Sequence, residues 1–481
     1  MPFVVRTGDW TVSSEQVRIL KMKLGSALIS FMSIVPFSGA AERTIQLISS
    51  TPTQAWQVAR VLHWDVPTSS TAAPLQVEIN RDQTEQTIQG FGGCFNEKGW
   101  EVLKLLPDKE REEVLGALFD PAQGCGLSLG RIPMGANDYS LQYFSIARDQ
   151  EFLIPYIHHA QRFNPDLRFW TSPWCPPAWM KTNGHYAGVP SPLNDLKPAQ
   201  AGSEMHTQFR MEPRVLAAYA RYFVKFVDAY RAEGINIDAV HVQNEPNACQ
   251  NFPSCIWTPG DLAIFVAGYL GPQFRKDQRA TQIWLGTINW PQAERVDAIL
   301  SDSGARPFIS GVGFQWGGKE AIPHIRREYP DLPLMQTETE CGDGANDWTA
   351  AEYTFSLMHH YFNHGAGAYM FWNMVLDETG ASTWGWRQNA MITVNRQTRD
   401  VVYNPEFILM KHFSHFVRPG ARRLKSNGSF ADGLAFRNSG GDSVLILVNR
   451  DRDPQSVQIK VDGKILRAEL PAKSFNTLLL P

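Results

Sequence analysis

The chain has 481 residues, 43% of them hydrophobic, and a formal net charge of −3. This length exceeds one small module, and this apolar share is enough for a buried core, which excludes disordered, collagen-like and fibrous proteins. No long block of like charge occurs, so the sequence predicts no nucleic-acid partner. Some of the 15 Trp residues stand next to Pro, Asn or Glu, as in the segment 170–179 (WTSPWCPPAW), and aromatic faces beside carboxylates suit a sugar ligand.

Residues 1–41 have the composition of an extension followed by a signal peptide. Lys21 and Lys23 form a basic start, residues 24–37 are mostly apolar, and residues 38–41 are small, as at a cleavage site. We therefore expect export to the periplasm or the medium, with Met22 as the true start. The alternative is a membrane anchor, but the apolar stretch is shorter than the ~20 residues that span a bilayer, so no stable membrane insertion is expected.

The six cysteines form no CxxC motif and no Cys/His cluster with zinc spacing. No HExxH helix motif occurs either, so we expect no metal and no cofactor. Cys249 and Cys255 enclose a short loop, and in an exported protein they could form a disulfide or remain two free thiols.

Eight short apolar runs alternate with helical periodicity between residues 86 and 373, and this alternation predicts a (β/α)8 barrel over residues 86–418. Helices are expected at 97–118 and 259–270 among other places. A doubly wound sheet alternates in the same way, but no GxGxxG or Walker loop follows any strand. The predicted strands are 86–93, 126–134, 167–174, 237–246, 282–288, 308–316, 332–338 and 367–373.

After residue 419 the pattern changes to alternation with period two, which predicts a small β-sandwich at 419–481. Asp462-Gly463 is a typical hairpin turn within this region. Residues 42–85 also contain strand-like pieces that are too few to fold alone. We expect them to join the C-terminal strands in one sandwich, with the barrel inserted between.

Two predicted barrel strands end in glutamate. Glu245 closes the fourth strand in Gln-Asn-Glu-Pro, and Glu338 closes the seventh in Gln-Thr-Glu. Either residue alone could be a cap or an ion-pair partner. Strands four and seven lie on opposite sides of the barrel mouth, however, and a facing pair of carboxylates is the machinery of glycoside hydrolysis.

Further motifs at the strand ends make the chain resemble glycoside hydrolase family 30, whose members are retaining β-glycosidases that include glucosylceramidases. The similarity covers roughly residues 45–481, and it implies the barrel, the sandwich, an acid/base at Glu245 and a nucleophile at Glu338. The motifs are Gly90-Phe91-Gly92-Gly93, Arg131-Ile132-Pro133-Met134, the segment 172–184 (SPWCPPAWMKTNG), Gln243-Asn244-Glu245-Pro246 and Trp372-Asn373.

The same resemblance implies a set of substrate-binding residues. Asn244 would bind the sugar 2-hydroxyl, and Arg131 and Glu97 would pair with hydroxyls or orient the carboxylates. The remaining members are Trp179, Trp316 and Trp372 as apolar walls, and Asn373. The chain departs from the family at Glu97, where relatives often have Asp, and at Glu340, which is a rival nucleophile two residues beyond Glu338.

The predicted function is therefore retaining hydrolysis of a β-glycosidic bond in a carbohydrate substrate, through a glycosyl-enzyme intermediate. Related enzymes cleave glucosylceramide, β-1,6-glucan, β-xylosides or β-1,6-galactan. We favour a β-glucoside, and a polysaccharide over a lipid, because an exported protein meets glycans first. The alternatives are an inactive carbohydrate-binding barrel and a metal-dependent hydrolase.

Overall fold

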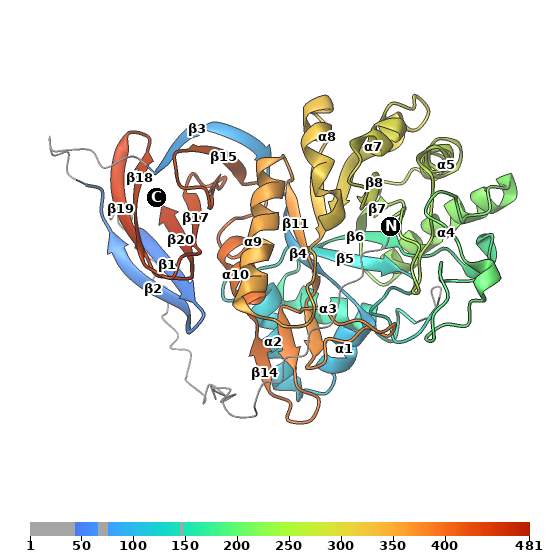
Figure 1. Cartoon of the computed structure of the whole chain (residues 1–481), viewed down its shortest axis with the longest axis horizontal. Coiled ribbons are helices and arrows are strands. Elements are labelled where there is room, and N and C mark those ends of the chain that lie inside the picture. Colours follow the sequence, from blue (N-terminus) through green and yellow to red (C-terminus); the bar gives the residue numbers. More distant parts are fainter. Residues whose placement is uncertain (1–43, 66–75, 145–147) are drawn as a thin grey trace, which may run out of the picture. The chain divides into compact units, whose positions relative to one another are not determined.

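The structure is a computed structural model that describes residues 44–65, 76–144 and 148–481. The predicted signal peptide and start site lie outside the described residues. In the described residues, eight parallel strands form one sheet in the order β10-β9-β8-β7-β6-β5-β4-β11 (Figure 1). The strands are β4 (Gly90–Cys94), β5 (Leu129–Met134), β6 (Arg168–Pro173), β7 (Ile237–His241), β8 (Gln282–Ile288), β9 (Ile309–Gln315), β10 (Leu334–Glu338) and β11 (Ala368–Asn373).

The sheet closes into a barrel because its two end strands also meet. The Gly367 amide donates to the Leu334 carbonyl at 2.8 Å, and the Thr339 amide donates to the Met370 carbonyl at 3.0 Å. All eight predicted strands are present. The first is shorter than predicted, because residues 86 and 87 belong to the preceding strand of the sandwich.

Helices follow the barrel strands and pack their apolar faces against them. They are α1 (Glu97–Leu103), α2 (Asp108–Phe119), α3 (Leu153–Phe163), α4 (Pro213–Ala232), α5 (Pro259–Phe265), α6 (Gly271–Lys276), α7 (Ala293–Leu300), α8 (Ile322–Glu328), α9 (Trp348–Asn363) and α10 (Pro405–Ser414). The single helix expected at 97–118 is two helices, because Pro107 starts a new one. The helix expected at 259–270 changes to a π-helical turn at Val266–Leu270.

The interior of the barrel is apolar at the amino ends of the strands. Leu129, Trp170, Trp284, Met335 and neighbours form a buried cluster there. The polar side chains gather at the opposite end, where β/α loops leave the strands. Function in this fold resides at that carboxyl end.

The sandwich strands come from both ends of the described chain, in the sheet order β19-β18-β3-β15-β16-β17-β20-β1-β2. Figure 1 shows the blue strands β1 and β2 among the red C-terminal ones. β1 pairs with β20, and β3 lies between β15 and β18, as the sequence predicted for residues 42–85. The strands are β1 (Ile45–Thr51), β2 (Gln54–Leu62), β3 (Val77–Thr87), β15 (Arg422–Asn427), β16 (Gly433–Arg437), β17 (Ser443–Asn449), β18 (Gln455–Val461), β19 (Lys464–Leu470) and β20 (Ser474–Leu480).

Candidate active site

Glu245 and Glu338 both stand at the carboxyl end of the barrel. Glu338 is the last residue of β10, and Glu245 follows β7 in a segment that continues along β8. The Gln243 amide donates to the Gly286 carbonyl at 2.9 Å, and the Glu245 amide donates to the Thr287 carbonyl at 3.1 Å. The loop before Pro246 is therefore fixed to the neighbouring strand.

The backbone of Glu245 has a φ of 43°, in the left-handed region that side chains other than glycine rarely adopt. Such a conformation costs about 1–3 kcal/mol and persists only where the surroundings enforce it. Two hydrogen bonds enforce it here. The Glu245 amide donates to the Thr287 carbonyl, and the Ala248 amide donates to the Glu245 carbonyl at 2.8 Å. Strain of this kind is typical of functional sites.

Arg131, from β5, links the two sides of the mouth. Its Nη1 donates to Glu338 Oε2 at 2.5 Å and its Nη2 donates to Asn244 Oδ1 at 2.6 Å, while Nε and Nη2 also donate to Ser172 Oγ. The side chain is fully buried. A buried guanidinium stays charged, so Arg131 fixes the position of the Glu338 carboxylate and favours its ionised form.

Three indole rings surround this guanidinium. The Arg131 Cζ lies 5.0 Å from the ring centroid of Trp170, 4.3 Å from that of Trp174 and 5.2 Å from that of Trp372. The aromatic faces stabilise the cation and keep water from its ion pair, which strengthens the pair.

Asn244 is oriented by its own hydrogen bonds. Its Oδ1 accepts from Arg131, from Thr287 Oγ1 at 2.9 Å and from Gln315 Nε2 at 2.8 Å. All three donors bind the side-chain oxygen of Asn244. Its amide nitrogen Nδ2 is therefore the group that can donate to a substrate hydroxyl.

Burial, and after it the negative charge of Glu338, raise the pKa of Glu245 to about 8. Burial also raises the pKa of Glu338, but the charge and hydrogen bond of Arg131 oppose that effect. Among the described residues, the only side chain that donates to the Glu245 carboxyl group is Asn289, whose Nδ2 lies 3.2 Å from Glu245 Oε1. A proton shared by the pair would therefore reside on Glu245, an arrangement that suits an acid beside a carboxylate nucleophile.

This arrangement predicts the pH dependence of activity. A raised pKa keeps Glu245 protonated at neutral pH, so kcat/KM should fall as the pH rises through about 8. At acid pH the rate should fall because Glu338 gains a proton. Profiles of kcat/KM for a substrate with a poor leaving group would test this, and Glu245→Ala should remove the alkaline limb. An alkaline limb that persists in that variant would assign it to another group.

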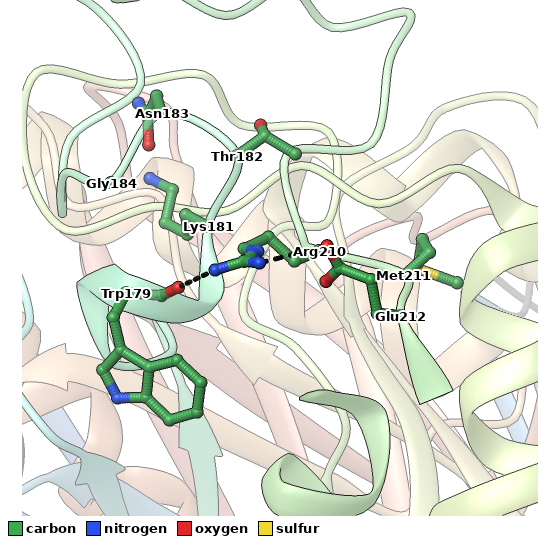
Figure 2. A pocket seen from close by; sticks show the side chains of 8 residues that line it. All are labelled: Trp179, Lys181, Thr182, Asn183, Gly184, Arg210, Met211 and Glu212. Atoms are coloured by element: carbon green, nitrogen blue, oxygen red, sulfur yellow. Dashed lines mark hydrogen bonds and ion pairs between the residues drawn. The ribbon is translucent and has the colours of Figure 1, made fainter. Parts of the chain in front are cut away.

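The three predicted tryptophan walls differ in exposure. Trp372 is 1% exposed and packs on Arg131 and Trp174, Trp316 is half-buried, and Trp179 is 56% exposed. Trp179 borders an open hollow of about 960 Å³ that also contains Arg210 and Glu212 (Figure 2). Arg210 donates to the Trp179 carbonyl and to Glu212, so the loop that carries this indole is held in place.

Glu97 and Asn373, both predicted to bind substrate, have hydrogen-bond partners within the protein. Glu97 is 1% exposed, accepts from the Leu141 amide at 2.6 Å and pairs with Arg148 at 3.0 Å. Asn373 Oδ1 accepts from Asn96, and its Nδ2 donates to Gln388. These bonds brace the loops around the mouth, and the predicted contacts of both residues with a substrate stay a prediction.

Glu340 lies beyond the end of β10 and accepts a hydrogen bond from Tyr353 Oη at 2.5 Å. Arg131 donates to Glu338, and among the hydrogen bonds of the described residues none joins Arg131 to Glu340. This geometry favours Glu338 over its rival as the nucleophile.

Sequence reasoning did not single out Asp138 and Gln315. Gln315 Nε2 donates to Glu338 Oε2 at 2.6 Å, so it is a second ligand of that carboxylate. Asp138 is buried, and burial together with the charge of Glu338 raises its pKa to about 8. In the sequence, the only sign of a role was their position: Gln315 is the polar last residue of β9, and Asp138 lies in the loop after β5.

The six cysteines are free thiols in the structure, so the disulfide considered for Cys249 and Cys255 is not formed. Cys255 is fully buried, whereas Cys249 is partly exposed and lies 3.6 Å from Gln208 Nε2. Within the described ranges, no helix combines the length and the apolar character that crossing a bilayer requires.

Known proteins resemble the chain along most of its length. It is 28% identical over 432 residues to a Caenorhabditis elegans protein with the provisional name glucosylceramidase 1, a match that covers 81% of this chain and 79% of the relative. It is 23% identical to the endo-1,6-β-D-glucanase of Neurospora crassa, covering 83% of this chain and 85% of that one. The crystal structure of SrfJ from Salmonella typhimurium superposes with a TM-score of 0.79 at 26% identity, covering 91% and 99% of the two chains.

Two family profiles match consecutive parts of the sequence. The TIM-barrel domain of glycosyl hydrolase family 30 matches residues 88–417, and the β-sandwich domain of the same family matches residues 420–478. These limits agree with the barrel and with the C-terminal strands of the sandwich. The chain therefore belongs to glycosyl hydrolase family 30.

Proposed function

We propose that the protein is a retaining β-glycosidase that cleaves β-glucosidic bonds of a glycan by double displacement. The observation that carries this proposal is the asymmetry of the carboxyl pair. Glu338 is bound by Arg131 and Gln315, whereas Glu245 has a pKa raised to about 8. One carboxyl group is thus prepared to attack and the other to donate a proton.

In the first step the Glu338 carboxylate attacks the anomeric carbon while Glu245 protonates the departing oxygen. The glycosidic C–O bond breaks and an ester between sugar and Glu338 forms. Esterification removes the charge of Glu338, so the pKa of Glu245 falls and Glu245 can take a proton from water. That water attacks the anomeric carbon, the ester breaks and the configuration is retained.

The Asn244 amide would donate to the sugar 2-hydroxyl, an interaction that strengthens in the transition state. Asp138, a carboxyl group that burial keeps protonated at neutral pH, can both donate to and accept from another hydroxyl. We favour glucan over lipid as substrate. Glucosylceramidases and endo-1,6-glucanases are both among the relatives, and an enzyme that is exported, as the sequence predicts, would meet external glycans.

Product analysis tests this function. The protein should release nitrophenol from a nitrophenyl β-glucoside and shorten β-1,6-glucan, and proton NMR of early products should show the β-anomer first. EDTA should not change the rate. Binding of glucan without turnover would support the inactive barrel, and an α-anomer as first product would exclude the retaining mechanism.

A further inference from the structure

A small hollow, the basal hollow, lies at the amino end of the barrel, opposite the catalytic mouth. Its volume is about 220 Å³. A cavity of about 150 Å³ is large enough to hold benzene, so a six-membered ring with one or two small substituents fits here. Five barrel strands, β5 to β8 and β10, contribute the side chains Leu129, Trp170, Ala239, His241, Trp284 and Met335 to its lining.

The wall of the basal hollow is mostly apolar. Leu129, Trp170, Ala239, Trp284 and Met335 all belong to the buried cluster at the amino ends of the strands. An apolar wall of this kind favours a ligand with a hydrophobic body.

The charged side chains at the rim of the basal hollow are paired with each other. Arg168 Nε lies 2.8 Å from Asp238 Oδ2, and both side chains are partly exposed. The pair leaves neither charge free to attract an ion, and moving an ion past it into the apolar interior would cost desolvation energy. The ligand that fits is therefore neutral.

The inner end of the basal hollow holds polar atoms that lack partners. His241 is fully buried, and in the described part of the chain neither of its ring nitrogens has a hydrogen-bond partner. Trp170 Nε1 also lacks one within the same residues. Burial and then the positive charge of Arg131 hold the pKa of His241 well below its usual range, so the ring is neutral, with one N–H donor and one bare nitrogen acceptor.

The imidazole of His241 is held in place by its neighbours. Its centroid lies 4.3 Å from that of Trp170 and 5.5 Å from that of Trp284. Gly313 on β9 leaves the room for it, because a Cβ at that position would lie 2.5 Å from His241 Cε1. Trp284 is fixed in turn, since its Nε1 donates to Gln282 Oε1 at 2.9 Å. A ligand would thus meet a formed site at a low cost in conformational entropy.

We propose that the basal hollow is a binding site, separate from the catalytic mouth, for a small neutral ring compound with a hydroxyl group, such as a phenol. Its ring lies against the apolar wall. Its hydroxyl group donates to the bare nitrogen of His241 and accepts from Trp170 Nε1, because one hydroxyl is both a donor and an acceptor. Buried polar groups in proteins are nearly always paired, and this ligand supplies the partners while it also covers the apolar wall. The proposal does not depend on the glycosidase function.

Fluorine NMR of 4-fluorophenol with the full chain tests the site. The ligand signal should broaden in a saturable way, with a dissociation constant on the order of 1 mM. Ala239→Leu adds three carbons inside the hollow and should weaken binding about 10-fold or more. Ala232→Leu is the matched control, the same change at the exposed last residue of α4, and it should leave binding unchanged.

Three results of this experiment would overturn the proposal. Absence of saturable broadening with the wild-type protein would mean that the hollow holds water alone. Undiminished binding by Ala239→Leu would place the ligand elsewhere, for example among the indoles of the catalytic mouth. An equal loss in Ala232→Leu would show that the effect is not specific to the hollow.

A second ligand tests the role of His241. 4-Fluorotoluene has a methyl group in place of the hydroxyl group, so the ratio of the two affinities measures the contribution of the hydrogen bonds. This ratio should shift about 10-fold toward the toluene in His241→Leu, which removes both ring nitrogens. An unchanged ratio would overturn the hydrogen-bonding part of the proposal. If His241→Leu does not fold by circular dichroism, Trp170→Phe, which removes the Nε1 donor, provides the same comparison, and Ala239→Leu still decides where the ligand binds.

Discussion

Glu338→Gln should lower kcat/KM by about 10⁴-fold or more on every β-glucoside, because an amide cannot form the glycosyl ester. Glutamine retains the size of glutamate and an oxygen that can accept from Arg131 and Gln315, so the site should keep its structure. The wild-type protein treated with a 2-deoxy-2-fluoro glucoside should accumulate a covalent adduct. Fluorine slows both steps, and a good leaving group keeps the first faster than the second. Peptide mass mapping should find the sugar on Glu338.

Glu340→Gln is the control for this prediction. Its carboxylate lies beyond the end of β10 and accepts from Tyr353, so the variant should still form the adduct and still hydrolyse the aryl glucoside. A label on Glu340 would assign the nucleophile to the rival residue. An inverted product without any label would exclude the covalent intermediate.

Glu245→Ala should produce a loss that depends on the leaving group. Substrates with poor leaving groups need the proton that Glu245 carries at neutral pH, and they should lose on the order of 10²-fold or more in rate. With a nitrophenyl glucoside, the rate of the first step, formation of the glycosyl-enzyme, should fall less, because nitrophenolate leaves without a proton. Added azide should restore turnover and yield a β-glucosyl azide, because a small anion can enter in place of the base-activated water.

Glu97→Gln is the matched control for Glu245, since Glu97 is another buried glutamate whose partners are Leu141 and Arg148. This change should lower stability without any leaving-group dependence or azide product. If Glu245→Ala slowed all substrates equally and azide had no effect, Glu245 would lose the acid/base role.

The strands of the barrel could be predicted because each is a short apolar run between turn residues. The strand β15 was missed, since its sequence Arg-Arg-Leu-Lys-Ser-Asn is mostly polar and only its position between β3 and β16 gives it partners. The break between α1 and α2 was also missed, although Pro107 marks it. The strand β15 depends on pairing with strands distant in the sequence, whereas the break between α1 and α2 follows from the inability of proline to continue a helix.

The two catalytic candidates could be located from the sequence, but their surroundings could not. Arg131 and Glu338 are separated by 207 positions and meet only because β5 and β10 belong to one closed barrel. Periodicity shows which side chains point inward, and it does not show which of them touch across the mouth. The roles of Gln315 and Asp138 depend on these cross-barrel contacts, as does the hydrogen-bonded position of Glu97.

The interleaved sandwich constrains the order in which the chain can mature as it leaves the ribosome. β1 and β3 emerge first, yet their partners β20 and β15 are made only after the entire barrel has been synthesised. Until then these N-terminal strands expose unpaired edges and apolar side chains such as Ile45 and Val77, which are buried in the finished sandwich. Pairing over such long separations is slow and leaves the nascent chain open to aggregation. A polypeptide that stops before β20 would thus lack a strand on which its first residues depend.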